Sequence, residues 1–289
     1  MKKALKKILL TLVVGATVIG LAACGGNESN NKPSDNAENK NEAVSTEEGN
    51  KGLEKIKEKG TLVVGLSADY APYEFHKIID GKDQIVGFDV EIGKAIAEAL
   101  GVDIEIKDME FGSLIGSLQA GKLDMVISGL SPDEERKKSV DFSDIYYEAT
   151  HGVLVKAENK DKYKTLDDLA GKKVGAQMGS IQAELAKAQI KDADLKLLGD
   201  VNNLILELKS GKIDALVVEI PVAETVVTTN TDLVVAEPEI VDNEGGSAIA
   251  VAKGENDLLE AVNKTIKELK ESGKLDKFIE EAEALAKDE

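Results

Sequence analysis

The segment Leu114-Ile-Gly-Ser-Leu-Gln-Ala-Gly-Lys-Leu-Asp-Met-Val-Ile-Ser-Gly129 aligns without a gap with Leu204-Ile-Leu-Glu-Leu-Lys-Ser-Gly-Lys-Ile-Asp-Ala-Leu-Val-Val-Glu219. In each copy the Leu-Ile-x-x-Leu pattern has helical spacing, and a glycine (Gly121 or Gly211) stands where a helix C-cap favours positive φ. A short apolar run follows and predicts a buried strand. Agreement over sixteen consecutive positions predicts two similar α/β lobes.

The rest of the chain alternates between strand and helix patterns. The predicted strands are 61–66, 103–107, 152–156 and 173–176. The predicted helices are 89–100 and 181–189. Strands separated by helices predict doubly wound α/β lobes with parallel sheets. Ligands of such sheets bind beyond the carboxyl ends of the strands. Candidate site residues that directly follow predicted strands are Ser67, Ser128, Gly129, Ser131, Gln177, Gly179, Ser180 and Glu219.

The composition excludes several classes of protein. The 289 residues include 54 acidic residues against 36 Lys and Arg, for a formal net charge of -18. A nucleic-acid backbone would be repelled by such a surface. One Cys and two His allow neither an internal disulfide nor a Cys-rich metal cage. We therefore expect no nucleic-acid partner, no metal and no cofactor.

The N-terminal segment is typical of a secreted lipoprotein. Residues 1–7 carry four lysines and no acid, and an apolar run follows at 8–23, which predicts a signal peptide over residues 1–23. The sequence Leu-Ala-Ala-Cys24-Gly resembles a bacterial lipobox, in which the Cys receives acyl chains such as palmitate. The alternative is a buried free Cys after an ordinary cleavage site. Residues 24–52 are polar and predict a flexible tether that holds the folded part outside the membrane.

Arg136 follows a helix-start pattern. Ser131-Pro132-Asp133-Glu134 reads as a capping box and predicts a helix to about Lys138. A helix start and an Arg one turn later suit a carboxylate ligand. Spacing alone leaves two alternatives open: Ser131 is only a cap, and Arg136 belongs to a solvated charge run.

Other candidates have similar alternatives. Glu219 ends the second copy of the repeat and is expected at the crevice, unless it is an ordinary acid at a strand end in water. Ser180 is expected to cap the helix that it precedes, which is compatible with a ligand contact. Among the aromatic residues, Tyr73 is expected in the core, and Tyr70 and Phe111 in the site.

Five motifs together carry a resemblance to a known family. The motifs, at residues 67–75, 87–91, 123–131, 135–144 and 171–180, resemble those of the polar amino-acid-binding proteins of ABC importers, solute-binding family 3, over residues 53–285. The resemblance implies two lobes joined by two crossover strands, near 152–155 and 246–251, with a ligand cleft between them. The first lobe would comprise 53–151 and 250–289, and the second lobe 152–249.

The same resemblance implies roles for the candidate residues. Arg136 would bind the α-carboxylate of an amino acid, helped by Ser131, the Gly129 backbone and Ser180. Tyr70 and Phe111 would flank its side chain. The family usually has Asp where this chain has Glu219, which would accept the α-ammonium group. Basic-amino-acid binders often carry an acid or an amide where this chain has Ser67.

These patterns together predict a function. We expect a lipid-anchored protein on the extracytoplasmic face of the cell membrane that captures a polar or basic L-amino acid by lobe closure. It would act as a monomer and deliver the amino acid to an ABC permease and its ATPase. Cation–π contacts with Tyr70 and Phe111, together with the acidic surface, favour Arg or Lys as ligand. The chain is not expected to be an enzyme; the alternatives are a dehydratase-like enzyme that uses Glu219 as an acid, and a ligand-sensing module.

Overall fold

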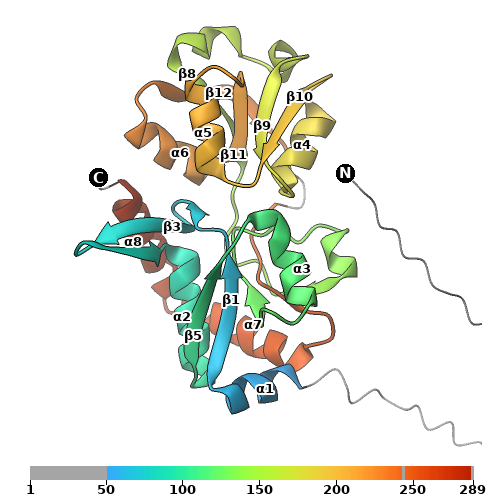
Figure 1. Cartoon of the computed structure of the whole chain (residues 1–289), viewed down its shortest axis with the longest axis vertical. Coiled ribbons are helices and arrows are strands. Elements are labelled where there is room, and N and C mark those ends of the chain that lie inside the picture. Colours follow the sequence, from blue (N-terminus) through green and yellow to red (C-terminus); the bar gives the residue numbers. More distant parts are fainter. Residues whose placement is uncertain (1–50, 243–244, 288–289) are drawn as a thin grey trace, which may run out of the picture. The chain divides into compact units, whose positions relative to one another are not determined.

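The computed structural model of the chain describes residues 51–242 and 245–287, which fall within a single compact unit (Figure 1). The predicted signal peptide (1–23), Cys24 and all but the last two residues of the predicted tether (24–52) lie outside the described residues. Within the two described ranges, we find no helix that has both the length and the apolar character needed to cross a membrane.

The first lobe is built on a five-stranded sheet with the order β5-β1-β6-β13-β7. β1 runs parallel to β5 and β6, and β13 runs antiparallel to β6 and β7. Figure 1 shows α2 and α3 on opposite sides of this sheet. Ile92 of α2 and Leu114 of α3 accordingly belong to separate apolar clusters. The strands and helices are β1 (Thr61–Leu66), β5 (Asp103–Asp108), β6 (Met125–Val126), β7 (Val140–Phe142), β13 (Ala250–Ala252), α1 (Gly52–Lys59), α2 (Phe88–Leu100), α3 (Leu114–Gln119), α7 (Asn256–Glu271) and α8 (Lys274–Lys287).

The second lobe has the same sheet order with different members, β10-β9-β11-β8-β12. β9 runs parallel to β10 and β11, and β8 runs antiparallel to β11 and β12. The predicted helix 181–189 is α4, and its Ser180 is the N-cap, as expected. The strands and helices are β8 (His151–Lys156), β9 (Lys173–Gln177), β10 (Asp194–Leu198), β11 (Ala215–Glu219), β12 (Leu233–Ile240), α4 (Ile181–Gln189), α5 (Val201–Lys209) and α6 (Ile220–Thr229).

The repeat seen in the sequence is a repeat in the structure. Gly121 and Gly211 follow α3 and α5 with φ of 68° and 74°. The aspartate of each copy binds the backbone of the neighbouring strand: Val63 N donates to Asp124 Oδ2 at 2.7 Å, and Lys173 N donates to Asp214 Oδ2 at 3.0 Å. The predicted fold class of two α/β lobes is therefore confirmed, although each sheet is mixed rather than wholly parallel.

The first connection between the lobes differs from its predicted position, 152–155, whereas the second overlaps its predicted position, 246–251. Residues 152–155 lie inside β8, because an apolar Gly-Val-Leu-Val run can be buried on both faces of a sheet. The chain crosses between the sheets at 143–150 and again after β12, where the described residues are 241–242 and 245–249. Tyr147 and Ser247 form an antiparallel bridge between the two connections. We call these two connections the hinge.

The helix predicted from Ser131 to Lys138 is also different. The structure has only a short 3-10 turn, Arg136–Lys138. Its N-cap position is Glu135, not Ser131, and Asp133 Oδ1 accepts from the backbone N–H of Arg136, the first residue of the turn, at 2.8 Å. The other 3-10 turns within residues 51–242 and 245–287 are Phe111–Ser113, Ala157–Lys162 and Leu166–Leu169.

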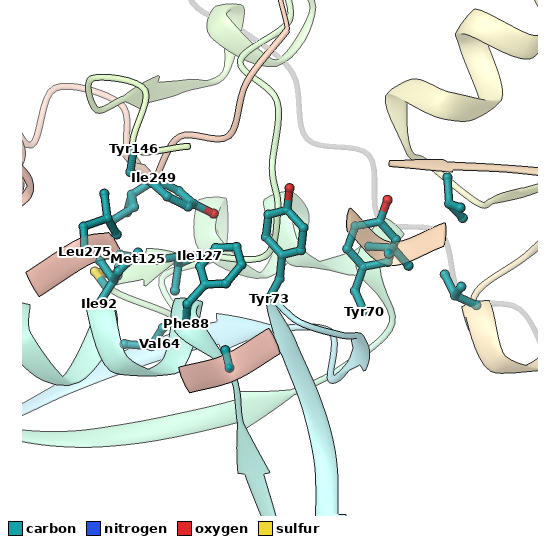
Figure 2. Packing of buried hydrophobic residues seen from close by; sticks show 14 of the residues in the cluster. Val64, Tyr70, Tyr73, Phe88, Ile92, Met125, Ile127, Tyr146, Ile249 and Leu275 are labelled. Atoms are coloured by element: carbon teal, nitrogen blue, oxygen red, sulfur yellow. The ribbon is translucent and has the colours of Figure 1, made fainter. Parts of the chain in front are cut away.

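A small antiparallel sheet, β2-β3-β4, belongs to the first lobe. Its strands are β2 (Asp69–Tyr70), β3 (Glu74–Ile79) and β4 (Lys82–Val86), and Asp80-Gly81 joins the last two. Figure 2 shows the rings of Tyr70, Tyr73 and Phe88 in a row beside this sheet. Tyr73 lies 4.5 Å from Phe88 and 5.5 Å from Tyr70, measured between ring centroids, and is fully buried, as predicted.

Candidate ligand-binding site

A small pocket lies between the two lobes. On the side of the first lobe, the lining residues come from β2 and β3 and from the loops that follow β1, β5 and β6. On the side of the second lobe, they come from the end of β9 and the start of α4. The lining residues are Ser67, Asp69, Tyr70, Glu74, Phe111, Ser128, Gly129, Gln177 and Gln182. A wider cavity of about 490 Å³ shares Ser67 and Asp69 with this pocket.

The structure brings the predicted site residues together. Six of them line the pocket: Ser67, Tyr70, Phe111, Ser128, Gly129 and Gln177. The others, which are Ser131, Arg136, Gly179, Ser180 and Glu219, are connected to it through direct contacts. Glu219 N donates to the Tyr70 hydroxyl at 3.0 Å, and Ser180 Oγ donates to the Gln177 carbonyl oxygen at 2.8 Å.

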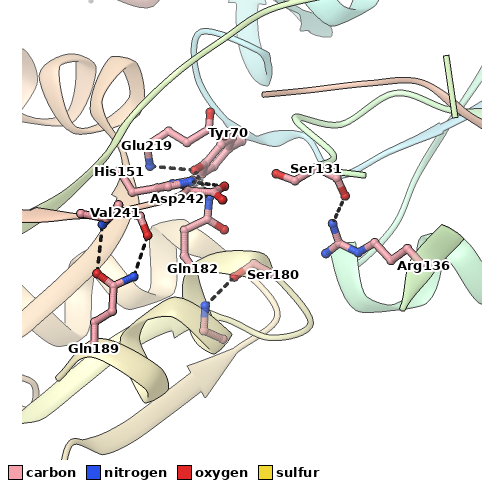
Figure 3. Close-up of polar contacts among 11 residues, drawn as sticks. Tyr70, Ser131, Arg136, His151, Ser180, Gln182, Gln189, Glu219, Val241 and Asp242 are labelled. Carbon is pink, nitrogen blue, oxygen red and sulfur yellow. Dashed lines mark hydrogen bonds and ion pairs between the residues drawn. The ribbon is translucent and has the colours of Figure 1, made fainter. Parts of the chain in front are cut away.

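Arg136 is not a solvated member of a charge run, since its side chain is only 12% exposed. Its guanidinium lies 5.5 Å from the Phe111 ring centroid. Nη1 donates to the Ser131 carbonyl oxygen at 2.6 Å (Figure 3). Nε pairs with Asp133 at 3.1 Å, and Nη2 donates across the lobes to the Gly179 carbonyl oxygen at 2.8 Å. A guanidinium has five N–H groups, so each terminal nitrogen keeps a second N–H for a ligand oxygen.

Two predicted ligand donors already have partners in the protein. Gly129 N donates to Asp89 Oδ2 at 2.9 Å. Ser128 Oγ donates to Glu74 Oε1 at 2.6 Å and accepts from Ser67 N at 3.0 Å. The N–H of Gly129 and the O–H of Ser128 are therefore used by two acids of the protein, Asp89 and Glu74, and are not available to an anionic ligand.

The site contains more buried acidic groups than basic ones. Glu74, Asp89 and Glu219 are at most 1% exposed, and one oxygen of each lacks a hydrogen-bond partner among the described residues. Burial raises the pKa of Glu219 to about 8 and that of Asp89 to about 6. Burial, reinforced by Asp89, also raises the pKa of Glu74 well above its usual range. Such groups become more stable as anions when a cation approaches.

Three lining residues escaped the sequence reasoning: Asp69, Glu74 and Gln182. Asp69 and Glu74 stand within the motif at 67–75, but no local pattern shows which acids of an acidic chain become buried. Gln182 lies in the first turn of α4, two residues after the N-cap Ser180. The predicted N-cap was the signal that could have identified Gln182, because it places the first turn of this helix at the site.

The chemistry of these groups suits a small ligand that has both a carboxylate and one or more cationic groups. Arg136 has N–H groups that could donate to a carboxylate, and the buried acids have oxygens that could accept from cations. Among the described residues, we find no group of His, Cys, Asp and Glu that could hold a metal ion.

Comparisons with known proteins agree with this chemistry. The profile of bacterial extracellular solute-binding proteins, family 3, matches residues 62–282. The arginine-binding extracellular protein ArtP of Bacillus subtilis is 39% identical over 95% of this chain and 96% of its own length.

Solved structures are similar as well. The amino acid ABC transporter substrate-binding protein AbpA of Streptococcus pneumoniae, bound to L-arginine, has a TM-score of 0.80 and 47% identity, over 82% of this chain and all of that one. The ancestral amino acid-binding protein AncCDT-1, a precursor of cyclohexadienyl dehydratase, has a TM-score of 0.72 and 37% identity, over 79% of this chain and 98% of that one.

All three relatives are named as binding proteins, so the comparisons favour the predicted binding function over the dehydratase-like alternative. The two-lobed fold and the matched profile lead to the same assignment. The chain belongs to the bacterial extracellular solute-binding proteins of family 3.

Proposed function

We propose that this protein captures a basic L-amino acid, with arginine as the preferred ligand, and delivers it to the permease of an ABC importer. The observation that carries this proposal is the charge imbalance of the pocket. Arg136 provides a guanidinium, whereas Asp69, Glu74, Asp89 and Glu219 provide four buried or nearly buried carboxylates. A neutral zwitterion would leave several of these acids unpaired, and a cationic side chain supplies a partner.

The roles of the two predicted key residues follow from their lobes. Arg136 on the first lobe binds the α-carboxylate through the second N–H of each terminal nitrogen. Glu219 on the second lobe accepts from the α-ammonium group through its unpartnered oxygen. Because the two groups come from different lobes, the ligand stabilises the arrangement in which the lobes are in contact.

Glu74 suits the cationic end of the ligand. Its Oε1 accepts from Ser128, and its Oε2 is buried without a partner among the residues that the structure describes. A guanidinium can donate two parallel hydrogen bonds to a carboxylate, which an ammonium group cannot do. This geometry favours arginine over lysine.

The cellular setting follows from the N-terminal sequence. Signal peptide removal before Cys24 and acylation of that residue would anchor the protein on the extracytoplasmic face of the membrane. The polar segment 24–52 would tether the monomeric binding unit, which presents its ligand to the permease and the associated ATPase.

Thermal denaturation and calorimetry of the ligand-stripped protein test this function. Of the twenty L-amino acids, arginine should raise the melting temperature most and bind in the micromolar range or tighter. Arg136→Lys keeps the charge but loses the planar fork, and should weaken arginine binding about 10- to 100-fold. Lys138→Arg, at an exposed neighbour, should leave binding unchanged. A protein that binds no amino acid, or an Arg136→Lys variant with wild-type affinity, would contradict the proposal.

A further inference from the structure

His151 occupies a central position that neither the sequence motifs nor the proposed ligand contacts explain. It is the first residue of β8, directly after one hinge connection, and it is 1% exposed. Its Nε2 lies 3.2 Å from Asp242 Oδ2 on the other hinge connection. Its Nδ1 lies 3.3 Å from Gln182 Nε2. Figure 3 follows this chain of contacts from Asp242 through His151 to Gln182 and Tyr70.

The contacts of His151 determine where its proton lies. Burial lowers the pKa of His151, against the opposing effect of Asp242, so the ring is neutral near pH 7. A neutral imidazole has one N–H donor and one bare acceptor nitrogen. A carboxylate can only accept, so Nε2 must carry the proton toward Asp242, and Nδ1 is left as an acceptor.

The bare Nδ1 in turn determines the orientation of the Gln182 amide. An acceptor on the ring requires the NH₂ group of Gln182 on that side, and the same nitrogen lies 3.4 Å from the Tyr70 hydroxyl. Both amide N–H groups are thereby used within the protein. The remaining polar atom of this pocket-lining side chain is the carbonyl oxygen Oε1, an acceptor for an N–H group.

We propose that His151 is a positioning residue for specificity: through its Nε2–H tautomer it holds the Gln182 amide with the carbonyl oxygen toward the ligand. The pocket then offers an acceptor, rather than a donor, to the nitrogen groups of a cationic amino acid. The proposal rests on the proposed function and assigns a role to a residue that does not touch the ligand.

Other charged groups near His151 support this orientation. Glu219 is its cross-strand neighbour on β11, and Asp242 faces it from the hinge. Tyr70, from β2 of the first lobe, is reached through Gln182. The Asp242 carboxylate accepts from the ring and the Tyr70 hydroxyl accepts from the Gln182 amide, so together they favour a ring that donates from Nε2 and an amide that donates from Nε2.

Nuclear magnetic resonance of the ligand-free protein tests the tautomer without any ligand. The chain has only two histidines, and His76→Gln identifies the signals of His151. Two-bond ¹H–¹⁵N correlations at pH 7.5 should show His151 as the neutral Nε2–H tautomer, and Asp242→Asn should reduce its population. A His151 ring that is protonated at Nδ1 would overturn the proposal, whatever the protein binds.

A double-mutant cycle tests the effect on binding. His151→Leu removes the acceptor and should weaken arginine binding about 10-fold, whereas His151→Asn, which places an oxygen near the position of Nδ1, should stay within about 3-fold of the wild type. In a Gln182→Glu background the carboxylate presents an acceptor in either orientation, so His151→Leu should cost less than about 3-fold.

The outcomes separate the proposals. An equal loss from His151→Leu in both backgrounds would show a purely structural role and overturn the positioning role. Failure of the wild-type protein to bind arginine would instead contradict the proposed function. The resonance measurement would still test the tautomer of His151 in that case, because it uses the ligand-free protein.

Discussion

At the scale of one residue, the ionised carboxylate of Glu219 is unfavourable in the folded, ligand-free protein. Its side chain is 1% exposed, its Oε2 lacks a partner among the described residues, and burial raises its pKa to about 8 from a usual value of 4.5. Below about pH 4.5 the carboxyl is protonated in both the folded and the unfolded state, and no penalty exists. As the pH rises towards 8, the unfolded state ionises first, and the free energy of unfolding falls.

We therefore expect Glu219→Gln to stabilise the ligand-free protein at pH 8 by about 1 to 3 kcal/mol and to leave its stability unchanged near pH 4. The same substitution should weaken arginine binding, because the α-ammonium group loses its anionic acceptor. Thermal or urea denaturation at both pH values measures the first effect. Glu224→Gln, at an exposed position of α6, is the control. An equal gain at both pH values would exclude the ionisation argument.

At the scale of elements, β2 and the start of α5 make a polar contact across the lobes. Asp69 Oδ2 accepts from Val201 N at 2.7 Å and from Gln177 Nε2 at 3.1 Å, and Oδ1 accepts from Ser67 Oγ at 3.0 Å. A carboxylate at the first residue of a helix is favoured by the free N–H groups and the helix dipole. Burial, opposed by the Val201 bond, raises the pKa of Asp69 to about 6. We infer that this contact holds the lobes together.

Asp69→Ala should consequently weaken the binding of every ligand by a similar factor, about 10-fold, and mainly by faster dissociation. Stopped-flow measurements with arginine and with citrulline, its uncharged analogue, check both points. Asp200→Asn removes the same charge from the N-cap of α5, whose bond to Asn203 N stays within the second lobe, and should change dissociation little. A loss confined to arginine would mean that Asp69 contacts the cation directly.

At the scale of the whole molecule, the lobes also approach each other through glycine backbone. Gly179 has φ of 82°, and a Cβ at this position would lie 3.0 Å from Gly112 Cα of the other lobe. Gly171 has φ of 66°, and a Cβ there meets nothing within 4 Å among the described residues. The two positions thus share the backbone requirement but differ in the contact between lobes.

Gly179→Ala and Gly171→Ala should both lower the free energy of unfolding by about 1 to 2 kcal/mol, since both force Ala into the left-handed region. Only Gly179→Ala should also weaken arginine binding, by about 10-fold or more, because the lobes can no longer make full contact. Denaturation and calorimetry of the two variants side by side provide the comparison. Equal affinities would show that the approach of Gly112 and Gly179 is unnecessary for binding.

Glu74, Asp89 and Glu219 also couple binding to protons. Cation binding stabilises their ionised forms, and burial raises the pKa of Asp89 to about 6, that of Glu219 to about 8 and that of Glu74 well above its usual range. Arginine should therefore release protons when it binds near pH 7, and its affinity should fall as the pH is lowered from 8 to 5.5. Calorimetry in buffers with different ionisation enthalpies measures the release. Citrulline, which lacks the side-chain charge, should release fewer protons, and equal release by the two ligands would argue against the role of Glu74 and Asp89.

Local patterns in the sequence were sufficient to predict the two lobes and several residues that line the pocket between them. The sixteen-residue repeat, the positive-φ glycines Gly121 and Gly211 and the Ser180 cap each depend on neighbours in the chain, and the structure has them as predicted. Arg136 also lies near the pocket, although the helix expected to carry it is a short turn that begins at Arg136, where Asp133 accepts from the first backbone N–H.

Only the tertiary structure decided what surrounds these residues. The burial of Glu74 and Glu219, the Asp69 contact with α5 and the hydrogen bonds of Gln182 and His151 join segments that are 31 to 149 residues apart in the chain. The 54 acidic residues show that the protein is acidic, but they do not show which acids are buried. Only the buried, unpaired acids have a charge that a ligand must balance. The free energy of those groups depends on desolvation by both lobes together, which no short stretch of sequence contains.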